Sequence, residues 1–384
     1  AVGRGGRGAG GGPRGCGRCG GRGLGPVVLN LCRIAGAGWL APRLGTPILA
    51  LGWAILLAGI LQLVFLLPAL RGLDLLALPR WGWRHVDVRK IMRLMVPTLF
   101  GSSVAQINLL LDTVFASLLI TGSQTWLSQS TRFLELPLGV FGVALGTVIL
   151  PALSRHHVGT DRAGFSRALD WGFRITLLIA IPAMLALLFL AKPLVATLFQ
   201  HGQFTAFDTH MATLSVLAFV CGLPGYALVK VLLPAFYSRQ DTRTPVRAGV
   251  TALLANVVMT LLFIGLLFWW WAPPAVRQLP LLQAIAGVPG LHMGMAIAGA
   301  TSSYINAGLL WHWLRRDRVY QAQPGWLRHL ARLALACLAM VVVLGLGLKL
   351  WPDWTDVGTW TRIWHLAVLV GAGGLSYATV LFAT

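Results

Sequence analysis

Five ionisable residues interrupt long apolar stretches of this 384-residue chain, and they are the side chains whose chemistry most needs an explanation. They are Arg33, Asp112, Arg132, Glu135 and Lys230. An ionised group inside a lipid bilayer is costly unless it is paired or faces water, so such residues commonly serve in ligand or ion binding. Each is a candidate functional residue if the apolar stretches cross a membrane.

The spacing of these residues suggests specific roles and leaves alternatives open. Arg132 and Glu135 are three positions apart, so on a helix they share one face, where they can pair and line a polar cavity. An ion pair that only stabilises helix packing is the alternative. Asp112 could hold a cation or take up a proton, or it could hydrogen-bond to Thr113. Lys230 could bind a ligand or extend its ammonium group to the membrane surface.

The elements that must position these residues are long and apolar. The chain is 57% hydrophobic and 11% charged, with a mean hydropathy of +0.74, which excludes an ordinary soluble globular domain. A helix needs about 20 mostly apolar residues to cross the hydrocarbon core, so we expect an all-α, polytopic transmembrane bundle of about ten helices. The long stretches are Thr46–Pro68, Ile91–Thr121, Thr125–Ser154, Trp171–Phe199, Met211–Tyr237, Val246–Trp271, Leu291–Leu314, His329–Leu350 and Ile363–Ala383, and the shorter Val27–Ala41 carries Arg33.

Lys and Arg gather in alternate gaps between these stretches. Basic residues are enriched on the cytoplasmic side of membrane proteins, which places both chain ends in the cytoplasm. The net charge of +20 therefore reports topology and not a nucleic-acid partner. The rich gaps hold Arg71, Arg80, Arg84, Arg89, Lys90, Arg93, Arg155, Arg162, Arg167, Arg174, Arg239, Arg243, Arg247, Arg315, Arg316, Arg318, Arg328 and Arg332, and the poor gaps hold only Arg43, Lys192, Arg277, Lys349 and Arg362.

Uncharged polar residues and prolines also lie within the expected spans. The polar residues suit hydrogen bonds between helices, and the prolines bend or break helices. Bent helices around a polar pocket favour alternating access, although static bundles also bend. The polar residues are Gln106, Asn108, Asn256, Thr260 and Asn306, and the prolines are Pro97, Pro137, Pro182 and Pro224.

Residues 1–26 are rich in Gly and Arg and contain no acidic residue, so we expect them to be disordered. We interpret them as a sequence artefact, with an RG-rich tail that binds nucleic acid as the alternative. Cys16 and Cys19 have CxxC spacing but lack a second pair, so we expect no metal site. The sequence has no Walker, GxSxG or HExxH motif, which argues against an ATP-driven pump or a hydrolase.

Five strings occur in a common order across most of the chain. They are TRFLELPLG around Arg132, FGVALGTVILPALS at Phe141–Ser154, FQHGQFTAF at Phe199–Phe207, FYSRQDTRTP at Phe236–Pro245 and QPGW at Gln323–Trp326. Together they resemble the lipid II flippase family MurJ, also called MviN. That family belongs to the multidrug/oligosaccharidyl-lipid/polysaccharide exporter superfamily.

The resemblance implies a domain organisation. Residues 27–70 would be the last two helices of a first lobe, residues 71–90 a basic cytoplasmic linker, and residues 91–314 a second lobe of six helices. Residues 315–384 would be two additional helices that form a groove for a lipid tail. By this comparison the chain starts in the fifth of fourteen helices, and we expect it to be inactive alone.

The resemblance also implies a transporter and not an enzyme. It would move lipid II, an undecaprenyl diphosphate that bears a disaccharide-pentapeptide, from the inner to the outer leaflet of the bacterial inner membrane for cell wall synthesis. Arg132 stands where the family has a cavity arginine, which suits phosphate oxygens, and Glu135 matches an acidic residue. Thr131 replaces an Asp that often precedes that Arg. With Lys230, Arg132 and Glu135 form the expected substrate-binding set.

The resemblance further suggests where a coupling cation would bind. Asp112 and Asn256 match an aspartate and an asparagine of relatives that resemble sodium-coupled carriers, whereas Thr260 replaces a second acid. Proton coupling and the membrane potential are the alternatives to sodium. No other cofactor or metal is expected. The expected partners are lipid II, the phospholipid bilayer and the peptidoglycan synthesis machinery, and nucleic acid is not expected.

Two kinds of alternative remain. A polysaccharide-unit flippase or a cation-coupled drug antiporter belongs to the same superfamily, but FYSRQDTRTP argues against both. A polytopic membrane glycosyltransferase would need acidic motifs at the membrane surface. The gaps poor in basic residues hold only Asp208, Asp353 and Asp356.

Overall fold

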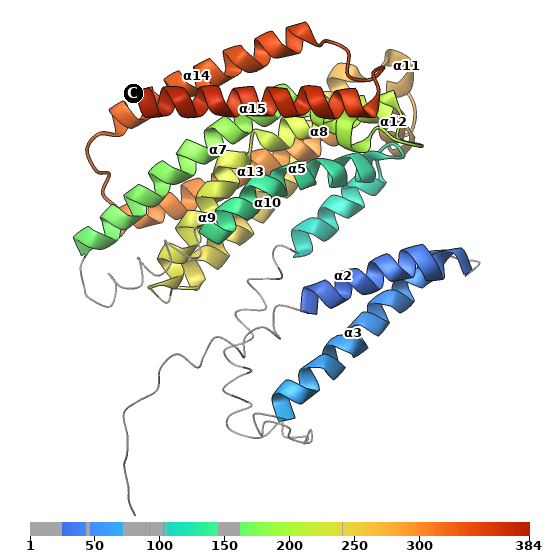
Figure 1. Cartoon of the computed structure of the whole chain (residues 1–384), viewed down its shortest axis with the longest axis horizontal. Helices are drawn as coiled ribbons and strands as arrows, with labels where there is room; N and C mark the ends of the chain where they lie inside the picture. The colour runs from blue at the N-terminus through green and yellow to red at the C-terminus, as the bar shows by residue number, and fades with distance from the viewer. Residues whose placement is uncertain are drawn as a thin grey trace, which may run out of the picture. The chain divides into compact units, whose positions relative to one another are not determined.

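The computed structural model describes residues 25–43, 47–71, 89, 92, 103, 106–144, 162–239 and 241–384. Every regular element in these residues is a helix, which confirms the all-α prediction. The chain divides into two compact units, Ala1–Lys90 and Ile91–Thr384, and each is described by itself (Figure 1). The predictions of a disordered tail and of a basic linker fall almost wholly outside the described residues.

The first unit is a helical hairpin. Helix α2 (Gly25–Ala35) continues through a π-helical turn (Gly36–Leu40) and a short 3-10 turn (Ala41–Arg43), and α3 (Pro47–Arg71) follows. Small residues let two helix backbones approach closely in a membrane. Alanines four residues apart on α3 provide such a stripe, and all three are buried: Ala50, Ala54 and Ala58. The side chain of Arg33 is exposed.

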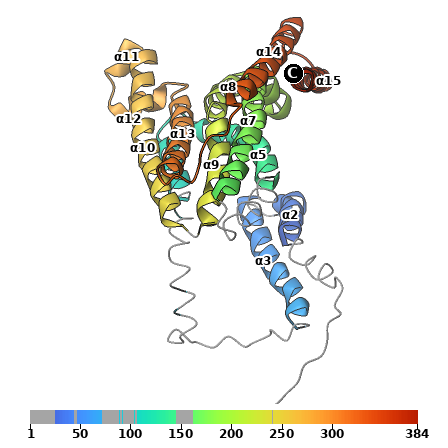
Figure 2. The same cartoon turned by 90° about the vertical axis from the view of Figure 1, so that its left-hand side faces the viewer.

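The first continuous described stretch of the second unit is the helical residues 106–117, and this unit contains most of the long helices (Figure 2). Helices α14 and α15 pack against each other and along α7. They run antiparallel in Figure 1. The elements are α5 (Ser123–Ala144), α7 (Arg162–Phe199), α8 (Ala206–Val220), α9 (Leu223–Tyr237), α10 (Arg243–Trp271), α11 (Pro274–Arg277), α12 (Leu281–Gly287), α13 (His292–Arg316), α14 (Trp326–Leu350) and α15 (Thr359–Ala383).

Among the described residues, four helices are long and apolar enough to cross a membrane: α7, α10, α14 and α15. The number rises to 6 when α8 with α9, and α12 with α13, are each taken as one bent span. Large apolar side chains point outward from these helices, with Leu254 on α10 62% exposed and Leu338 on α14 60% exposed. A soluble protein rarely exposes apolar surface of this extent, whereas lipid solvates it.

The predicted span Met211–Tyr237 is broken into α8 and α9, which meet at an angle of 43°. Pro224 lies in the first turn of α9, where its missing N–H group breaks no helical hydrogen bond. A Cβ atom at Gly222 would overlap Ala300 of α13, so glycine is required for the close approach at this break. The expectation that a proline bends or breaks the helix is therefore confirmed at Pro224.

Two further differences concern helix ends. Helix α7 begins at Arg162, well before the predicted start at Trp171. The extension is stable because Phe165, Leu169 and Phe173 recur at helical spacing and are buried. The short helices α11 and α12 were not predicted, and α12 meets α13 at 90°.

Hydrogen bonds and one ion pair join the basic junctions of the second unit at one end. Arg239 Nη1 lies 3.8 Å from Asp317 Oδ2, which connects the α9–α10 turn to the end of α13. Ser166 near the start of α7 donates to the Gln321 carbonyl at 3.0 Å. At the other end of α7, Gln200 donates to the Thr355 carbonyl in the α14–α15 loop at 3.2 Å. Junctions rich in basic residues thus lie at one end of α7, and the α14–α15 loop, which is poor in them, lies at the other end.

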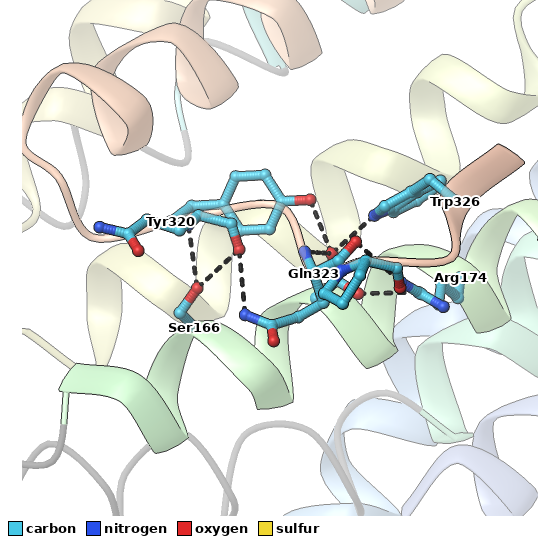
Figure 3. A network of polar contacts seen from close by, with 8 residues as sticks. Ser166, Arg174, Tyr320, Gln323 and Trp326 are labelled. Carbon is cyan, nitrogen blue, oxygen red and sulfur yellow. Dashed lines mark hydrogen bonds and ion pairs between the residues drawn. The ribbon is translucent and has the colours of Figure 1, made fainter.

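At the basic end, the carboxylate of Asp170 holds the loop between α13 and α14 against α7. Its Oδ1 atom accepts hydrogen bonds from the Tyr320 hydroxyl (2.9 Å), the Gln323 backbone N–H (3.2 Å) and the Trp326 indole N–H (2.8 Å). Burial is the main cause, and the hydrogen bond to Asp170 the next, of a raised pKa of the Tyr320 phenol. The hydroxyl therefore stays protonated and donates to Asp170. We call Asp170 with these donors and Arg174 the Asp170 clasp (Figure 3).

Arg174 completes the clasp. Its Nε atom lies 2.7 Å from Asp170 Oδ2, and Nη2 donates to the carbonyls of Gln323 and Pro324 at 3.2 and 2.8 Å. The guanidinium also lies over the Trp326 ring, 5.2 Å from its centroid. Gly325 has φ +90°, a conformation that favours glycine, and precedes the first residue of α14.

We predict that Asp170→Ala destabilises the second unit by about 2–4 kcal/mol, because three donors and Arg174 lose their acceptor in a buried position. Thermal unfolding in detergent measures the loss, and limited proteolysis should show new cleavage between α13 and α14. Asp353→Ala, which removes an exposed carboxylate, is the control. An unchanged melting temperature and cleavage pattern would contradict a stabilising role for the clasp.

Candidate functional site

Helix α5 carries the predicted cationic site on a face that the described helices of its own unit leave uncovered. Arg132 and Glu135 are exposed, and Ser128, one turn before Arg132, is exposed with them. The opposite face is buried, with Phe133 at 2% and Leu134 at 6% exposure. Alternation of buried and exposed positions at helical spacing therefore turns Arg132 outward from the core.

The predicted ion pair between Arg132 and Glu135 is not formed. Among the described residues, no hydrogen bond or ion pair engages either side chain, whereas the neighbouring Thr131 hydroxyl donates to the Ser128 carbonyl at 2.9 Å. The five N–H donors of the guanidinium thus have no acceptor in the described part of the chain. An exposed Arg with unused donors can bind an anionic group in bidentate fashion.

A hydrogen-bonded cluster that sequence reasoning missed positions α5. The Trp126 indole N–H donates to Asp208 Oδ1 at 2.9 Å, and Asp208 also forms a capping box with Thr205 at the start of α8. The Trp126 ring packs on the buried His292 ring with centroids 4.9 Å apart. Ser130 donates to the Ala212 carbonyl at 3.1 Å. These contacts fix the rotation of α5 and hence the direction of Arg132.

Lys230, the third predicted substrate-binding residue, lies on α9 and contacts α5. Its Nζ atom donates to the Leu138 carbonyl at 2.9 Å. The structure therefore places Lys230 against α5, the helix that carries Arg132 and Glu135. One N–H donor of its ammonium group is already bonded to the α5 backbone. Because an ammonium has three donors, further binding by Lys230 remains chemically available.

The predicted cation-coupling residues come together between residues 106–117 and α10. Asn108 donates to Asp112 Oδ2 at 3.0 Å, and Asn256 donates to Asn108 Oδ1 at 2.8 Å and to Asp112 Oδ1 at 3.4 Å. Asn256 is 4% exposed and Thr260, one turn further along α10, is 1% exposed. The expectation that Asn108 and Asn256 bond between helices is confirmed.

Two buried oxygen atoms at this cluster have no hydrogen-bond partner: Asn256 Oδ1 and Thr260 Oγ1. Buried polar atoms are almost always bonded, so an orphan pair needs an explanation. Asp112, Asn256 and Thr260 each carry side-chain oxygen, which is the ligand type that hard cations take. No group of three His, Cys, Asp or Glu side chains in the described part of the chain could hold a metal, so Asp112 would supply the only charge here.

Comparison with known proteins identifies the family. A family model described as "Lipid II flippase MurJ" matches residues 20–271, which is more than half of the chain. The chain belongs to the MurJ family. Membership together with the apolar helices makes it a multi-pass protein of the bacterial inner membrane.

MurJ-family relatives cover most of this chain. The "Probable lipid II flippase MurJ" of Vibrio cholerae is 41% identical over 356 residues, which are 93% of this chain and 63% of that protein. The "Lipid II flippase MurJ" of Burkholderia cenocepacia is 36% identical over 340 residues, 86% of this chain and 60% of that protein. The chain thus spans less than two thirds of the length of these relatives.

A solved structure supports the fold of the MurJ chain. "Lipid II flippase MurJ, inward closed conformation" is similar with a TM-score of 0.68 and 23% identity, over 93% of this chain and 66% of that one. At this identity the likeness shows the shared helical fold. The family strings found in the sequence are accordingly confirmed as signs of MurJ membership.

We predict that Trp126→Phe lowers stability by about 1–2 kcal/mol, because the hydrogen bond to the Asp208 carboxylate is lost. Arg132→Gln should leave stability unchanged, since the Arg132 side chain is exposed and forms no hydrogen bond or ion pair with the described residues. Thermal unfolding of the two variants in the same detergent tests both statements. A stability loss in Arg132→Gln as large as that in Trp126→Phe would make Arg132 a structural residue.

Proposed function

We propose that this protein is a lipid II flippase that moves the undecaprenyl-diphosphate-linked peptidoglycan precursor from the inner to the outer leaflet. The observation that carries the proposal is family membership with relatives named lipid II flippase at up to 41% identity. The described residues add the exposed guanidinium of Arg132, whose positive charge suits a diphosphate. The name of these relatives describes a transporter, so the proposed activity is transport and not catalysis.

Arg132 supplies the main contact with the diphosphate in this proposal. Its guanidinium is exposed on a helix of the membrane unit and has no acceptor among the residues that the structure describes, so phosphate oxygens would complete its bonding. Glu135, on the same face, would accept hydrogen bonds from sugar or peptide groups of the precursor. Lys230 would add positive charge beside α5.

The proposed transport cycle is alternating access. The cavity would open to the cytoplasm to admit the headgroup and then to the periplasm to release it. The 43° break between α8 and α9 supports a helix that can bend. Basic residues at one end of the unit support a cytoplasmic position for that end and for both chain termini.

The rival functions have less support. A polysaccharide-unit flippase or a drug antiporter would also bind its cargo in a membrane cavity, but the relatives named above carry the lipid II name. A membrane glycosyltransferase would need clustered acidic residues, and the described residues hold no cluster of three metal-ligating side chains. Peptidoglycan synthesis enzymes are candidate partners through the shared substrate.

We predict that Arg132→Ala abolishes rescue of cells depleted of their own flippase, tested in a chimera completed to the relatives' length. Protein level in the membrane should stay normal, because no hydrogen bond or ion pair joins the Arg132 side chain to the described residues. Arg328→Ala, which removes an exposed Arg of α14, should rescue fully. Wild-type rescue by Arg132→Ala would exclude Arg132 from transport.

We further propose that Asp112, Asn256 and Thr260 bind the coupling cation. Two orphan oxygens support this role: Asn256 Oδ1, on the amide that donates to Asp112, and Thr260 Oγ1, one turn further along α10. A bound cation would supply positive charge that neutralises Asp112 in the membrane interior. Sodium fits the oxygen donors, and a proton on Asp112 is the alternative.

We predict that sodium, compared with N-methylglucamine at equal ionic strength, stabilises the wild-type chain. At ten times the dissociation constant the gain is about 1.4 kcal/mol, or roughly 2–4 °C in melting temperature. Asp112→Asn should abolish this gain, while Asp353→Asn should keep it. A sodium effect that persists in Asp112→Asn would place the cation elsewhere, and a stability that depends on pH but not on sodium would favour the proton.

A further inference from the structure

A cavity lies in the membrane unit on the side of α13 that faces α7 and α9. Its volume is about 810 Å³, and its lining includes Leu232 of α9, Phe173 of α7 and Gly308 of α13. The loop held by the Asp170 clasp closes one wall, where Tyr320 and Trp326 line the cavity. A volume of this size is typical of ligand sites.

The cavity is charged at one end only. Arg315 and Arg318, at the C-terminal end of α13, line it, and none of the described acidic side chains does. The nearby acids are engaged elsewhere, since Asp317 lies 3.8 Å from Arg239 and Asp170 is enclosed in the clasp. The Arg315 guanidinium lies over the Trp311 ring, 4.8 Å from its centroid. The mouth is therefore cationic with aromatic walls.

The backbone at Arg318 is unusual in a way that concerns this cavity. Helix α13 ends with Val319 N–H bonded to the Leu314 carbonyl and Arg318 N–H bonded to the Arg315 carbonyl, both at 3.0 Å. This is the Schellman motif, whose left-handed position is usually glycine. Arg318 occupies that position with φ 54°. A side chain kept where glycine would be less strained points to a function for that side chain.

The apolar end of the cavity leads toward the middle of the membrane. Tyr304 lines this cavity and also a second one of about 670 Å³, whose other lining residues include Leu188, Leu217 and Ile297. Tyr304 lies about 16 Å along α13 from Arg315 at 1.5 Å per residue. That length is close to half of the roughly 30 Å hydrocarbon core.

We propose that this groove along α13 is a binding site for an anionic glycerophospholipid. Arg315 and Arg318 bind the phosphate and the anionic headgroup, and an acyl chain follows the apolar wall past Tyr304. Trp311 and Trp326 lie at the level of the headgroup, where amphipathic rings are favoured. The Asp170 clasp positions the wall, so the lipid also bridges α13 and the loop that leads to α14.

An anionic lipid fits better than other occupants of the same charge. A soluble phosphate would use the two arginines but leave the apolar length of the groove empty. A zwitterionic lipid would bring a cationic headgroup toward Arg315 and Arg318. Anionic lipids also carry the negative surface potential of the cytoplasmic leaflet, which is the side proposed for this end of α13.

The test measures lipid binding to the purified full chain by native mass spectrometry. Phosphatidylglycerol should bind at least fivefold more tightly than phosphatidylcholine with the same acyl chains. Arg318→Gly and Arg315→Gln should each weaken phosphatidylglycerol about tenfold and leave phosphatidylcholine unchanged. Arg318→Gly relieves the backbone strain, so its melting temperature should equal or exceed that of the wild type, which separates lost binding from misfolding.

Arg316→Gln is the matched control, because Arg316 is exposed on the same turn but does not line the cavity. Its affinity for phosphatidylglycerol should match that of the wild type. Equal binding of the two lipids, or an equal loss in Arg316→Gln, would overturn the proposal in favour of diffuse charge attraction. Displacement of phosphatidylglycerol by inorganic phosphate would overturn it in favour of a soluble anion.

Discussion

The carboxylate of Asp170 is the constraint on which much of the membrane unit depends. It is 2% exposed, and a buried carboxylate is tolerated only when donors surround it. Its donors come from Arg174 on the same helix and from a loop about 150 residues later. Satisfying this one group therefore brings the end of α13 and the start of α14 onto α7. The same requirement places Tyr320 and Trp326 as walls of the groove beside α13.

The positions of the additional helices α14 and α15 are set by this clasp and by a second contact at the opposite end of α7. Arg362, which is 6% exposed, donates through Nη1 to the Ala196 carbonyl at 3.0 Å and through Nη2 to the Thr355 carbonyl at 2.6 Å. Midway, the Tyr377 hydroxyl donates to the Leu178 carbonyl at 2.6 Å. Polar contacts at three levels of α7 therefore fix the positions of α14 and α15. The remaining surface of these two helices is suited to lipid, so without these contacts they would slide along α7.

The spans could be predicted from sequence because the bilayer imposes both their length and their hydropathy. The starts of α10, α13 and α14 fall within three residues of the predicted spans. The 90° turn at α12 could not be predicted, since it depends on packing against distant helices and not on local composition. Asp170 was missed because its partners lie far along the chain, although an acid directly before the apolar start at Trp171 was a signal. Trp126 and Asp208 are likewise 82 positions apart.

The candidate site shows where spacing alone stops being informative. Three-residue spacing allowed Arg132 to pair with Glu135, yet the structure leaves both side chains unpaired, because their helix face is turned away from the core. Arg362 is the opposite case, because its guanidinium donates hydrogen bonds to the backbone carbonyls of Ala196 and Thr355. The two hydrogen bonds of Arg362 to backbone carbonyls hold α15 against α7, although its Nε atom has no partner among the described residues. Within the described residues, no acceptor engages the side chains of Arg132, Arg315 and Arg318, so each keeps N–H donors whose geometry suits an anionic group.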